Sequence, residues 1–309
     1  MIVTVTLNPT LDRTLMVPEL RLGKVNRARA VRDDLGGKGV NVSRALQALG
    51  LPSTIVALLA GWTGKAMHEG LLSAGFDVVA LEVPGETRRN VTLRDEATNQ
   101  TTKVNEPGPA LDPDHATALA ERIAGLARAG DLWAFCGALP PAAPSDFYAR
   151  LIAIVQAAGA RAFLDTSGAA LKHGLPAHPF GVKPNREEAA ELLGVPLEAG
   201  IGDIAAARAL HASGIEVVAL SAGADGLVLA MGNQLILARP PRVPVASPIG
   251  AGDSALAGLL WAVSEACDPV ECARRAVACG AAAAMQEGTG VGDRALVEQL
   301  LPLVEIALA

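Results

Sequence analysis

The sequence predicts an α/β protein in which helices cover both faces of a mostly parallel sheet. Short apolar segments without polar alternation recur along the chain, and stretches with helical periodicity lie between them. Such segments are typical of buried parallel strands. The composition agrees, because 50% of the 309 residues are hydrophobic and only 3% are aromatic. Small aliphatic side chains allow helices to pack closely on a sheet.

The expected elements follow one another from the N-terminus, where residues 1–6 form the first buried strand. Further strands are predicted at residues 54–60, 132–136, 162–165, 180–183 and 217–221, and helices at residues 64–74 and 145–158. From about Gly250 to its end, the chain is predicted to be almost entirely helical. No internal repeat or linker divides it, so we expect one domain that spans residues 1–309.

Two polar regions interrupt this alternation. Residues 8–34 are strand-like and rich in charge, while residues 87–96 and 100–105 are Thr-rich and are separated by a turn-like Ala-Thr-Asn. We expect these regions, about 8–34 and 86–106, to form a small projecting β-sheet that acts as a lid. Exposed sheet edges are usually covered by another segment or take part in a contact with another chain. We therefore also expect a homodimer that forms through this sheet.

Charge and composition limit the partners. A net charge of −6 argues against nucleic acid, no apolar run reaches the roughly 18 residues of a membrane span, and the N-terminus lacks the features of a signal peptide. These observations predict a cytoplasmic protein with no nucleic-acid or membrane partner. Residues 1–50 nevertheless carry eight Lys/Arg against four acids. This basic segment is either a solvated face or lies beside an anionic substrate.

The Pro-Ile-Gly-Ala-Gly-Asp-Ser motif at residues 248–254 leads into an apolar helical stretch. Small residues let backbone N–H groups approach a ligand, and the positive end of the helix favours phosphate. Asp253 is either a functional carboxylate or an ordinary helix cap. The stretch also fits a dinucleotide pattern, Gly250-x-Gly252-x-x-Ala255. The Pro-rich segment before it is a poor central strand, which leaves an NAD-binding oxidoreductase as a remote alternative.

Two further motifs lie where a strand is expected to pass into a helix. Residues 36–39, Gly-Gly-Lys-Gly, place a cation inside a glycine-rich turn at a position where open α/β sheets bind ligands. In Lys-Pro-Asn-Arg-Glu-Glu, residues 183–188, Asn185 and Glu188 are three apart and so share one helix face. An amide and a carboxylate suit Mg²⁺, although an acidic helix N-terminus explains the pattern equally well.

Together the three motifs resemble those of the ribokinase-like (PfkB) carbohydrate kinases, and the resemblance covers nearly the whole chain. Residues 8–14, 36–41 and 87–91 are most similar to the branch that phosphorylates sugar phosphates, which includes 1-phosphofructokinase and tagatose-6-phosphate kinase. The resemblance implies a three-layer αβα sandwich, ATP and Mg²⁺ as cofactors, and a phosphorylated ketohexose as substrate, with fructose 1-phosphate first. Kinases for tagatose 6-phosphate or fructose 6-phosphate are the enzyme alternatives. A sugar-phosphate sensor without catalysis is a third class.

The resemblance also implies roles for individual residues. Asp253 would be the general base, and Gly250, Ala251, Gly252 and Asp253 would form an anion hole with the backbone N–H groups of the last three. The substrate side would comprise Asp12, Gly37, Lys38, Asn41, Arg88, Asn90 and Lys103, with help from Arg27. The ATP side would comprise Lys183, Asn185, Ser221, Gly223 and Gly226, and Glu188 with Asn185 would organise Mg²⁺ through water.

Three positions depart from the family pattern. Cys136-Gly-Ala138 stands where relatives usually carry Ser-Gly-Ser, so two hydroxyls that bond phosphate are missing. Arg89 replaces a residue that is often aliphatic, and Ser247-Pro248 stands where Asn/Asp-Thr is common. These differences concern the choice of sugar phosphate rather than the anion hole, which is intact.

Overall fold

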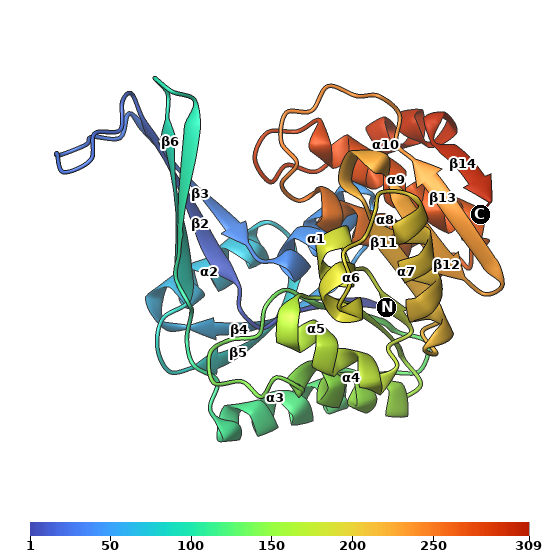
Figure 1. Ribbon diagram of the computed structural model, residues 1–309. Coiled ribbons are helices and arrows are strands. Elements are labelled where there is room, and N and C mark those ends of the chain that lie inside the picture. Colours follow the sequence, from blue (N-terminus) through green and yellow to red (C-terminus); the bar gives the residue numbers. More distant parts are fainter. Residues whose placement is uncertain (309) are drawn as a thin grey trace.

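The computed structural model describes residues 1–308, in which a large central sheet lies between two layers of helices and a smaller sheet projects to one side (Figure 1). Every helix in this part of the chain falls short of the length and apolarity that crossing a membrane requires.

Within residues 1–308 the central sheet has ten strands, in the order β14-β13-β12-β11-β10-β9-β8-β1-β4-β5. Their bounds are β1 (Ile2–Thr6), β4 (Thr54–Ala60), β5 (Asp77–Val83), β8 (Leu132–Cys136), β9 (Arg161–Asp165), β10 (Gly181–Val182), β11 (Val217–Ser221), β12 (Leu227–Met231), β13 (Gln234–Arg239) and β14 (Glu305–Leu308). Pairing is parallel from β5 to β11 and antiparallel from β11 to β14. Strands β1, β4 and β8 are buried at every position, as their continuous apolar sequences predict.

The helices divide between the two faces of this sheet. One face carries α1 (Lys38–Ala48), α2 (Gly61–Ser73), α8 (Ala251–Ser264), α9 (Pro269–Ala284) and α10 (Arg294–Leu300). The other carries α3 (Pro113–Leu126), α4 (Phe147–Ala157), α5 (Gly168–Gly174), α6 (Arg186–Leu193) and α7 (Ile201–Ala212). Short 3-10 helices occupy Leu175–Ala177, Gly223–Asp225 and Leu301–Leu303. The predicted three-layer αβα sandwich is therefore confirmed.

The second sheet, which we call the projecting sheet, contains β2 (Thr10–Val17), β3 (Ala30–Gly36), β6 (Arg88–Asp95) and β7 (Gln100–Asn105). Its order is β3-β2-β6-β7; the outer pairs are antiparallel and the central pair is parallel. It extends away from the sandwich, and the loop between β2 and β3 lies at its far end (Figure 1). The predicted small projecting sheet is confirmed.

The prediction of an almost entirely helical C-terminal region is wrong for the last residues. Glu305–Leu308 form β14, which pairs with β13 at the edge of the central sheet. Four residues hold too little periodicity to distinguish a strand from a helix, and pairing with β13 decides the outcome. Helix α2 also begins at Gly61, three residues before its predicted start.

Candidate functional site

The functional residues gather at the carboxyl edge of the parallel strands. Cys136, Asp165 and Ser221 each end a strand, and Lys183 directly follows β10. Because these strands are parallel neighbours, their ends meet at one edge, where open α/β sheets bind ligands. Helices α1 and α8 begin beside this edge and contribute the glycine-rich turns (Figure 1).

Asp253 lies in the first turn of α8, where 8% of its surface is exposed. The helix is capped by Gly250, at φ 83°, and no side chain makes the capping hydrogen bond. The interpretation of Asp253 as an ordinary cap is therefore wrong. Its Oδ2 instead accepts a hydrogen bond of 2.8 Å from Nδ2 of Asn41, which lies 212 residues away on α1. This contact joins the helix that follows the Gly36–Gly39 turn to the helix that follows the turn at Gly250.

The surroundings of Asp253 raise the pKa of its carboxyl group to about 6. Burial is the main cause, and the negative charge of Asp165 adds to it, while Asn41 and the ammonium groups of Lys38 and Lys183 act in the opposite direction. At neutral pH the group is mostly ionised and able to accept a proton. A pKa near the working pH is what general base catalysis needs.

Asp165 is a site residue that the sequence analysis missed. Its side chain is 1% exposed, and two lysines contact it: Lys38 Nζ lies 3.0 Å from Oδ1, and Lys183 Nζ lies 3.4 Å from Oδ2. Burial opposes ionisation, but these two cations outweigh it and hold the pKa of Asp165 below its usual value. The ion pairs also raise the pKa of Lys38. Its position in the sequence could have identified it, because it ends the strand predicted at residues 162–165 and ligands bind at the ends of such strands.

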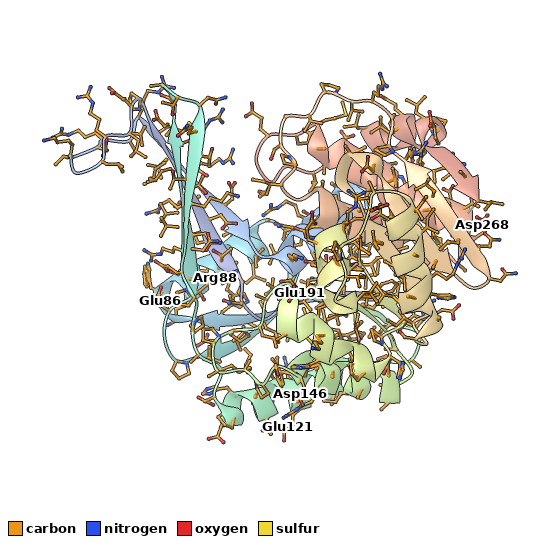
Figure 2. All side chains as sticks on the ribbon, viewed as in Figure 1. Glu86, Arg88, Glu121, Asp146, Glu191 and Asp268 are labelled. Carbon is orange, nitrogen blue, oxygen red and sulfur yellow. The ribbon has the colours of Figure 1, made fainter. Side chains whose placement is uncertain are left out.

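Asp12, Arg88 and Asn90 lie together on one face of the projecting sheet, near its base. Asn90 Nδ2 donates to Asp12 Oδ1 at 2.9 Å. Burial raises the pKa of Asp12, although this hydrogen bond and the nearby Arg88 oppose the rise. Arg88 Nε donates to the main-chain oxygen of Asn8 at 3.2 Å, and Figure 2 places Arg88 where the sheet joins the sandwich. The structure thus groups these three predicted substrate residues.

Two amides of this region keep unused acceptors. Among the described residues, Oδ1 of Asn41 and Oδ1 of Asn90 are buried and accept no hydrogen bond. A buried polar atom without a partner is costly, so a ligand that donates hydrogen bonds would be stabilised here. Gly37 begins α1 at φ 119°, and a Cβ on it would lie 2.7 Å from a methyl carbon of Thr6. Only glycine therefore lets this turn approach the site.

A cavity of about 690 Å³ lies beside the turn at residues 248–252 that leads into α8. Six of the predicted residues line it, namely Asn185, Ser221, Gly223, Gly226, Ala251 and Gly252. Its remaining wall is largely apolar and includes Val243, Val245, Ala255 and Val277. Lys183 is not part of this wall, because its ammonium group lies against Asp165. The cavity is therefore an apolar pocket whose polar end meets the start of α8.

The Asn185–Glu188 pair forms a capping box at the start of α6. Asn185 Oδ1 accepts from the N–H of Glu188 at 2.8 Å, and Glu188 Oε2 accepts from the N–H of Asn185 at 2.8 Å. The alternative explanation of this sequence pattern, that the two residues stabilise the N-terminus of a helix, is therefore confirmed. Residues 1–308 contain no cluster of three His, Cys, Asp or Glu side chains that could hold a metal ion alone. Glu188 retains its second carboxylate oxygen, Oε1, outside this box.

Of three further basic residues that the sequence analysis considered, Lys103 shares the sheet face of Asn90, because it lies opposite Thr92 on β6, and the other two lie elsewhere. The side chains of Arg89 and Arg88 point to opposite faces of the sheet, because successive residues of a strand alternate. Arg89 Nε donates to Oγ1 of Thr63 on α2 at 3.0 Å. Lys103 is exposed on the outermost strand β7. Arg27 is exposed in the loop between β2 and β3, which Figure 1 shows at the far end of the projecting sheet.

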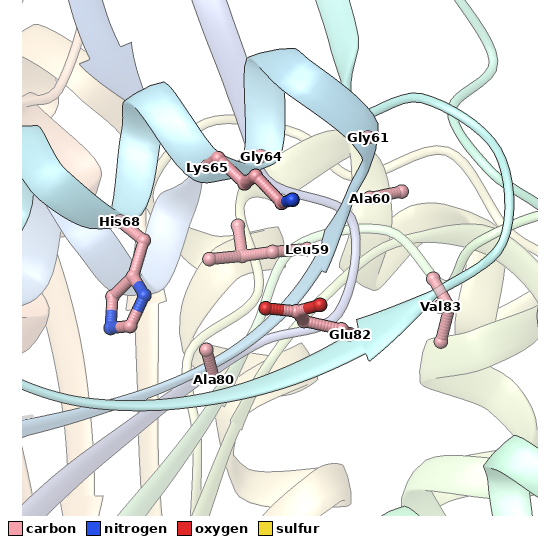
Figure 3. A pocket seen from close by; sticks show the side chains of 9 residues that line it. All are labelled: Leu59, Ala60, Gly61, Gly64, Lys65, His68, Ala80, Glu82 and Val83. Carbon is pink, nitrogen blue, oxygen red and sulfur yellow. The ribbon is translucent and has the colours of Figure 1, made fainter.

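A second, smaller cavity of about 40 Å³ lies between α2 and strands β4 and β5. Figure 3 shows Lys65, His68 and Glu82 around it. It has room for only a few water molecules, and Lys65 and Glu82 are exposed. It is therefore a feature of the sheet edge that is separate from the site.

Comparisons with known proteins agree with this geometry. The profile of the pfkB family of carbohydrate kinases matches residues 5–295. A protein from Xanthomonas campestris pv. campestris named 1-phosphofructokinase is 41% identical over 283 residues, which are 89% of this chain and 88% of that protein. A protein of the same name from Rhodobacter capsulatus is 41% identical over 278 residues, or 90% and 88% of the two chains. The crystal structure of phosphofructokinase-2 from Escherichia coli in complex with fructose-6-phosphate superposes with a TM-score of 0.91 at 29% identity and covers 98% of each chain.

Proposed function

We propose that this chain, which belongs to the pfkB family of carbohydrate kinases, uses ATP to phosphorylate fructose 1-phosphate to fructose 1,6-bisphosphate. The observation that carries the proposal is the position of Asp253. This buried carboxylate, with a pKa of about 6, directly follows Gly252 in the wall of the 690 Å³ cavity and accepts a hydrogen bond from Asn41 on α1. Relatives named 1-phosphofructokinase, at 41% identity, support the choice of sugar phosphate.

Asp253 acts as the general base in this proposal. It removes the proton from the attacking sugar hydroxyl, whose oxygen then attacks the γ-phosphorus of ATP, and ADP leaves. The N–H groups of Ala251, Gly252 and Asp253, at the positive end of α8, stabilise the charge on the transferring phosphoryl group. Most of the catalysis of phosphoryl transfer is positioning and electrostatics, which suits a site built mainly from backbone.

The sugar phosphate is held by the projecting sheet and α1. The unused acceptors of Asn41 and Asn90, with the carboxylate of Asp12, receive hydrogen bonds from sugar hydroxyls. Arg88 and Lys38 supply positive charge for the phosphate that the sugar already carries. Lys103, which lies opposite Thr92 on the same face as Asn90, adds positive charge beside this group, whereas Arg27 lies at the far end of the sheet. Among the basic residues of positions 1–50, Lys38 takes this role. Arg13, Arg21, Arg29 and Arg32 instead form ion pairs with nearby carboxylates on the projecting sheet and its loop, so most of the basic segment is a solvated face.

ATP occupies the large cavity, with its base against the apolar wall and its phosphates toward Ala251 and Gly252. Asn185, Ser221, Gly223 and Gly226 surround the nucleotide, and Lys183 meets the phosphates. The donor set fits Mg²⁺, which takes one or two carboxylates together with phosphate oxygens and water. Glu188, through its second oxygen, and Asn185 would hold it by way of water. Bound Mg²⁺ would neutralise phosphate charge.

The projecting sheet serves as a lid in this proposal and as the contact of a homodimer. Its two faces differ, since the register places Asp12 and Asn90 on one face and Leu15, Leu93 and Val104 on the other. The first face closes over the sugar phosphate. The second carries these apolar side chains beside the Arg13–Asp33 ion pair, and Val104 is 56% exposed, so a second copy would cover it.

A substrate panel tests the function directly. ADP release is measured with ATP, Mg²⁺ and, in turn, fructose 1-phosphate, fructose 6-phosphate, tagatose 6-phosphate and the unphosphorylated sugars. We expect the highest kcat/KM with fructose 1-phosphate. Preference for one of the 6-phosphates would select an alternative kinase of the same family. Activity on free sugars alone would overturn the sugar-phosphate assignment, and sugar-phosphate binding without ADP release would indicate a sensor.

A further inference from the structure

Arg44 has no part in the mechanism above, yet its guanidinium joins two segments that are distant in sequence. It lies on α1, three residues after Asn41. Its Nη2 donates to the main-chain oxygen of Leu35, near the end of β3. Its Nη1 donates at 3.4 Å to Oγ1 of Thr289, in the loop of residues 285–293 that follows α9. A single side chain therefore bonds the base of the projecting sheet to this loop.

The 285–293 loop in turn touches the anion-binding turn. The Cα of Thr289 lies 4.0 Å from the position that a Cβ on Gly250 would occupy. One residue earlier in the loop, the main-chain oxygen of Gly288 accepts a hydrogen bond of 2.9 Å from Oγ of Ser247. That same Oγ accepts from the N–H of Ile249 at 3.2 Å. Movement of the loop would therefore displace the turn that begins α8.

The environment of Arg44 makes this connection rigid. The side chain is partly buried, and burial lowers its pKa, although the carboxylates of Asp34, Asp12 and Asp253 surround it and favour the charge. Arginine remains charged under these conditions and presents several donors in a planar fork. Two acceptors on different segments are thus held at a fixed separation.

We propose that Arg44 is a positioning residue that couples the sugar-phosphate side of the site to the nucleotide side. By holding β3 and the 285–293 loop in one arrangement, it keeps the Gly250 turn in place for the transferring phosphate when the projecting sheet is seated on its substrate. This inference rests on the proposed function, because it assumes a sugar phosphate at the sheet and a nucleotide at the turn.

The kinetic test uses variants that keep charge and shape. Arg44→Lys keeps the positive charge but cannot bond both acceptors, and Thr289→Val removes the hydroxyl with little change in volume. If a smaller fraction of the protein is in the arrangement that binds substrate, the apparent affinity for substrate falls in proportion to that fraction. We therefore expect KM for both substrates to rise about 10-fold in each variant, as for the loss of one hydrogen bond to a charged group, with kcat nearly unchanged. Thr289→Ser, the matched control, should resemble the wild type.

A double-mutant cycle separates coupling from general damage. If Arg44 acts through Thr289, the double variant Arg44→Lys/Thr289→Val should be about as impaired as the worse single variant. Independent, multiplicative losses would overturn the inference. So would a fall in kcat with KM unchanged, which is the result of a smaller folded fraction, or equal effects of Thr289→Ser and Thr289→Val.

A second measurement does not depend on activity. Hydrogen–deuterium exchange of the ligand-free protein should show that Thr289→Val speeds exchange both in residues 285–293 and at the end of β3, while Thr289→Ser does not. Faster exchange in the loop alone would contradict the connection through Arg44. If the wild type phosphorylates no sugar phosphate, the proposed function fails, but this experiment still decides whether Arg44 joins the two segments.

Discussion

Asp253 shows how one residue acquires its chemistry from its surroundings. An aspartate in water is ionised well below neutral pH. In this site, burial and the nearby charge of Asp165 destabilise the ionised form, while the amide of Asn41 stabilises it. The result is a carboxylate that is deprotonated at pH 7 but basic enough to take a proton from a hydroxyl.

Replacing Asp253 should therefore affect turnover far more than binding. We expect Asp253→Asn to lower kcat at least about 100-fold, because an amide cannot take up the proton of the hydroxyl, with KM for both substrates changed by less than about 3-fold. Steady-state kinetics with fructose 1-phosphate provide the measurement. Asp268→Asn is the control, since this exposed aspartate caps α9 and asparagine caps as well. Turnover of the Asp253→Asn variant at the wild-type level would remove Asp253 from the mechanism.

The pH dependence of the reaction should report the same group. Protonated Asp253 cannot accept a proton, so kcat/KM should fall as the pH drops through about 6. Asp165→Asn removes a negative charge close to Asp253 and leaves Lys38 and Lys183 unpaired. Both changes favour ionised Asp253, and the acid limb of the profile should move to lower pH. A limb that stays in place or moves upward would contradict the role of Asp165.

Asp253 should also lower the stability of the protein at neutral pH. Its folded-state pKa is raised from 3.8 to about 6, so the folded chain binds more protons than the unfolded chain between these values, and stability falls as the pH rises through this window. Asp253→Asn avoids the penalty and should raise the free energy of unfolding at pH 7.5 by an amount on the order of 1–3 kcal/mol. Urea unfolding at pH 7.5 and pH 4 measures it. An equal gain in the free energy of unfolding at both pH values would show that the raised pKa of Asp253 is not its cause.

At the scale of elements, one ion pair fixes the rim of the large cavity. Arg186, in the first turn of α6, donates from Nε and Nη2 to the two oxygens of Asp203 on α7, both at 2.8 Å. Asp203 is 2% exposed at its side chain and also accepts from the N–H of Gly200 at the start of α7. Arg186 lines the cavity. The pair therefore joins two helices to each other next to the proposed nucleotide site.

Removing this carboxylate should destabilise the fold. Asp203→Ala leaves Arg186 without its main partner and α7 without its N-terminal hydrogen bond, so we expect a loss of about 2–4 kcal/mol in the free energy of unfolding. Chemical denaturation gives the value. Arg150→Ala is the comparison, because Arg150 pairs with Asp146 on the exposed surface and should cost less than about 1 kcal/mol. Similar losses in the two variants would show that burial does not strengthen the Arg186–Asp203 pair.

At the scale of the molecule, the projecting sheet has an outer face that one copy of the chain leaves uncovered. Val31 and Val104 are 57% and 56% exposed, and the register places both on the face opposite Asp12. Exposed apolar side chains grouped on one sheet face indicate a contact surface. The closed arrangement that would cover it is a twofold dimer.

We expect light scattering at micromolar concentration to give the mass of a dimer. Val104→Glu should shift it toward the monomer, because a carboxylate in an apolar interface is costly. Ile201→Glu, at a residue that is 81% exposed on α7, should leave the dimer intact. A monomeric wild type, or equal dissociation in the two variants, would exclude this face as the contact.

The sequence by itself determined the elements whose signal is local. The segments 54–60, 132–136 and 217–221 are strands at their predicted bounds, because a continuous apolar run followed by a turn fits a buried strand. The glycine-rich turns before α1 and α8 were likewise evident from residues that are neighbours in the chain. Their chemistry depends on backbone conformation, which a few adjacent residues decide.

Only the tertiary structure decided which side chains meet. Lys38 and Asp165 are separated by 127 residues, and the sequence analysis therefore missed the carboxylate that the two lysines share. The direction of Arg89 toward α2 and the pairing of β14 with β13 are further examples. Each depends on register and packing between distant segments, and no local pattern encodes them. The pKa of Asp253 belongs to the same class, because it arises from burial and from charges that folding brings together.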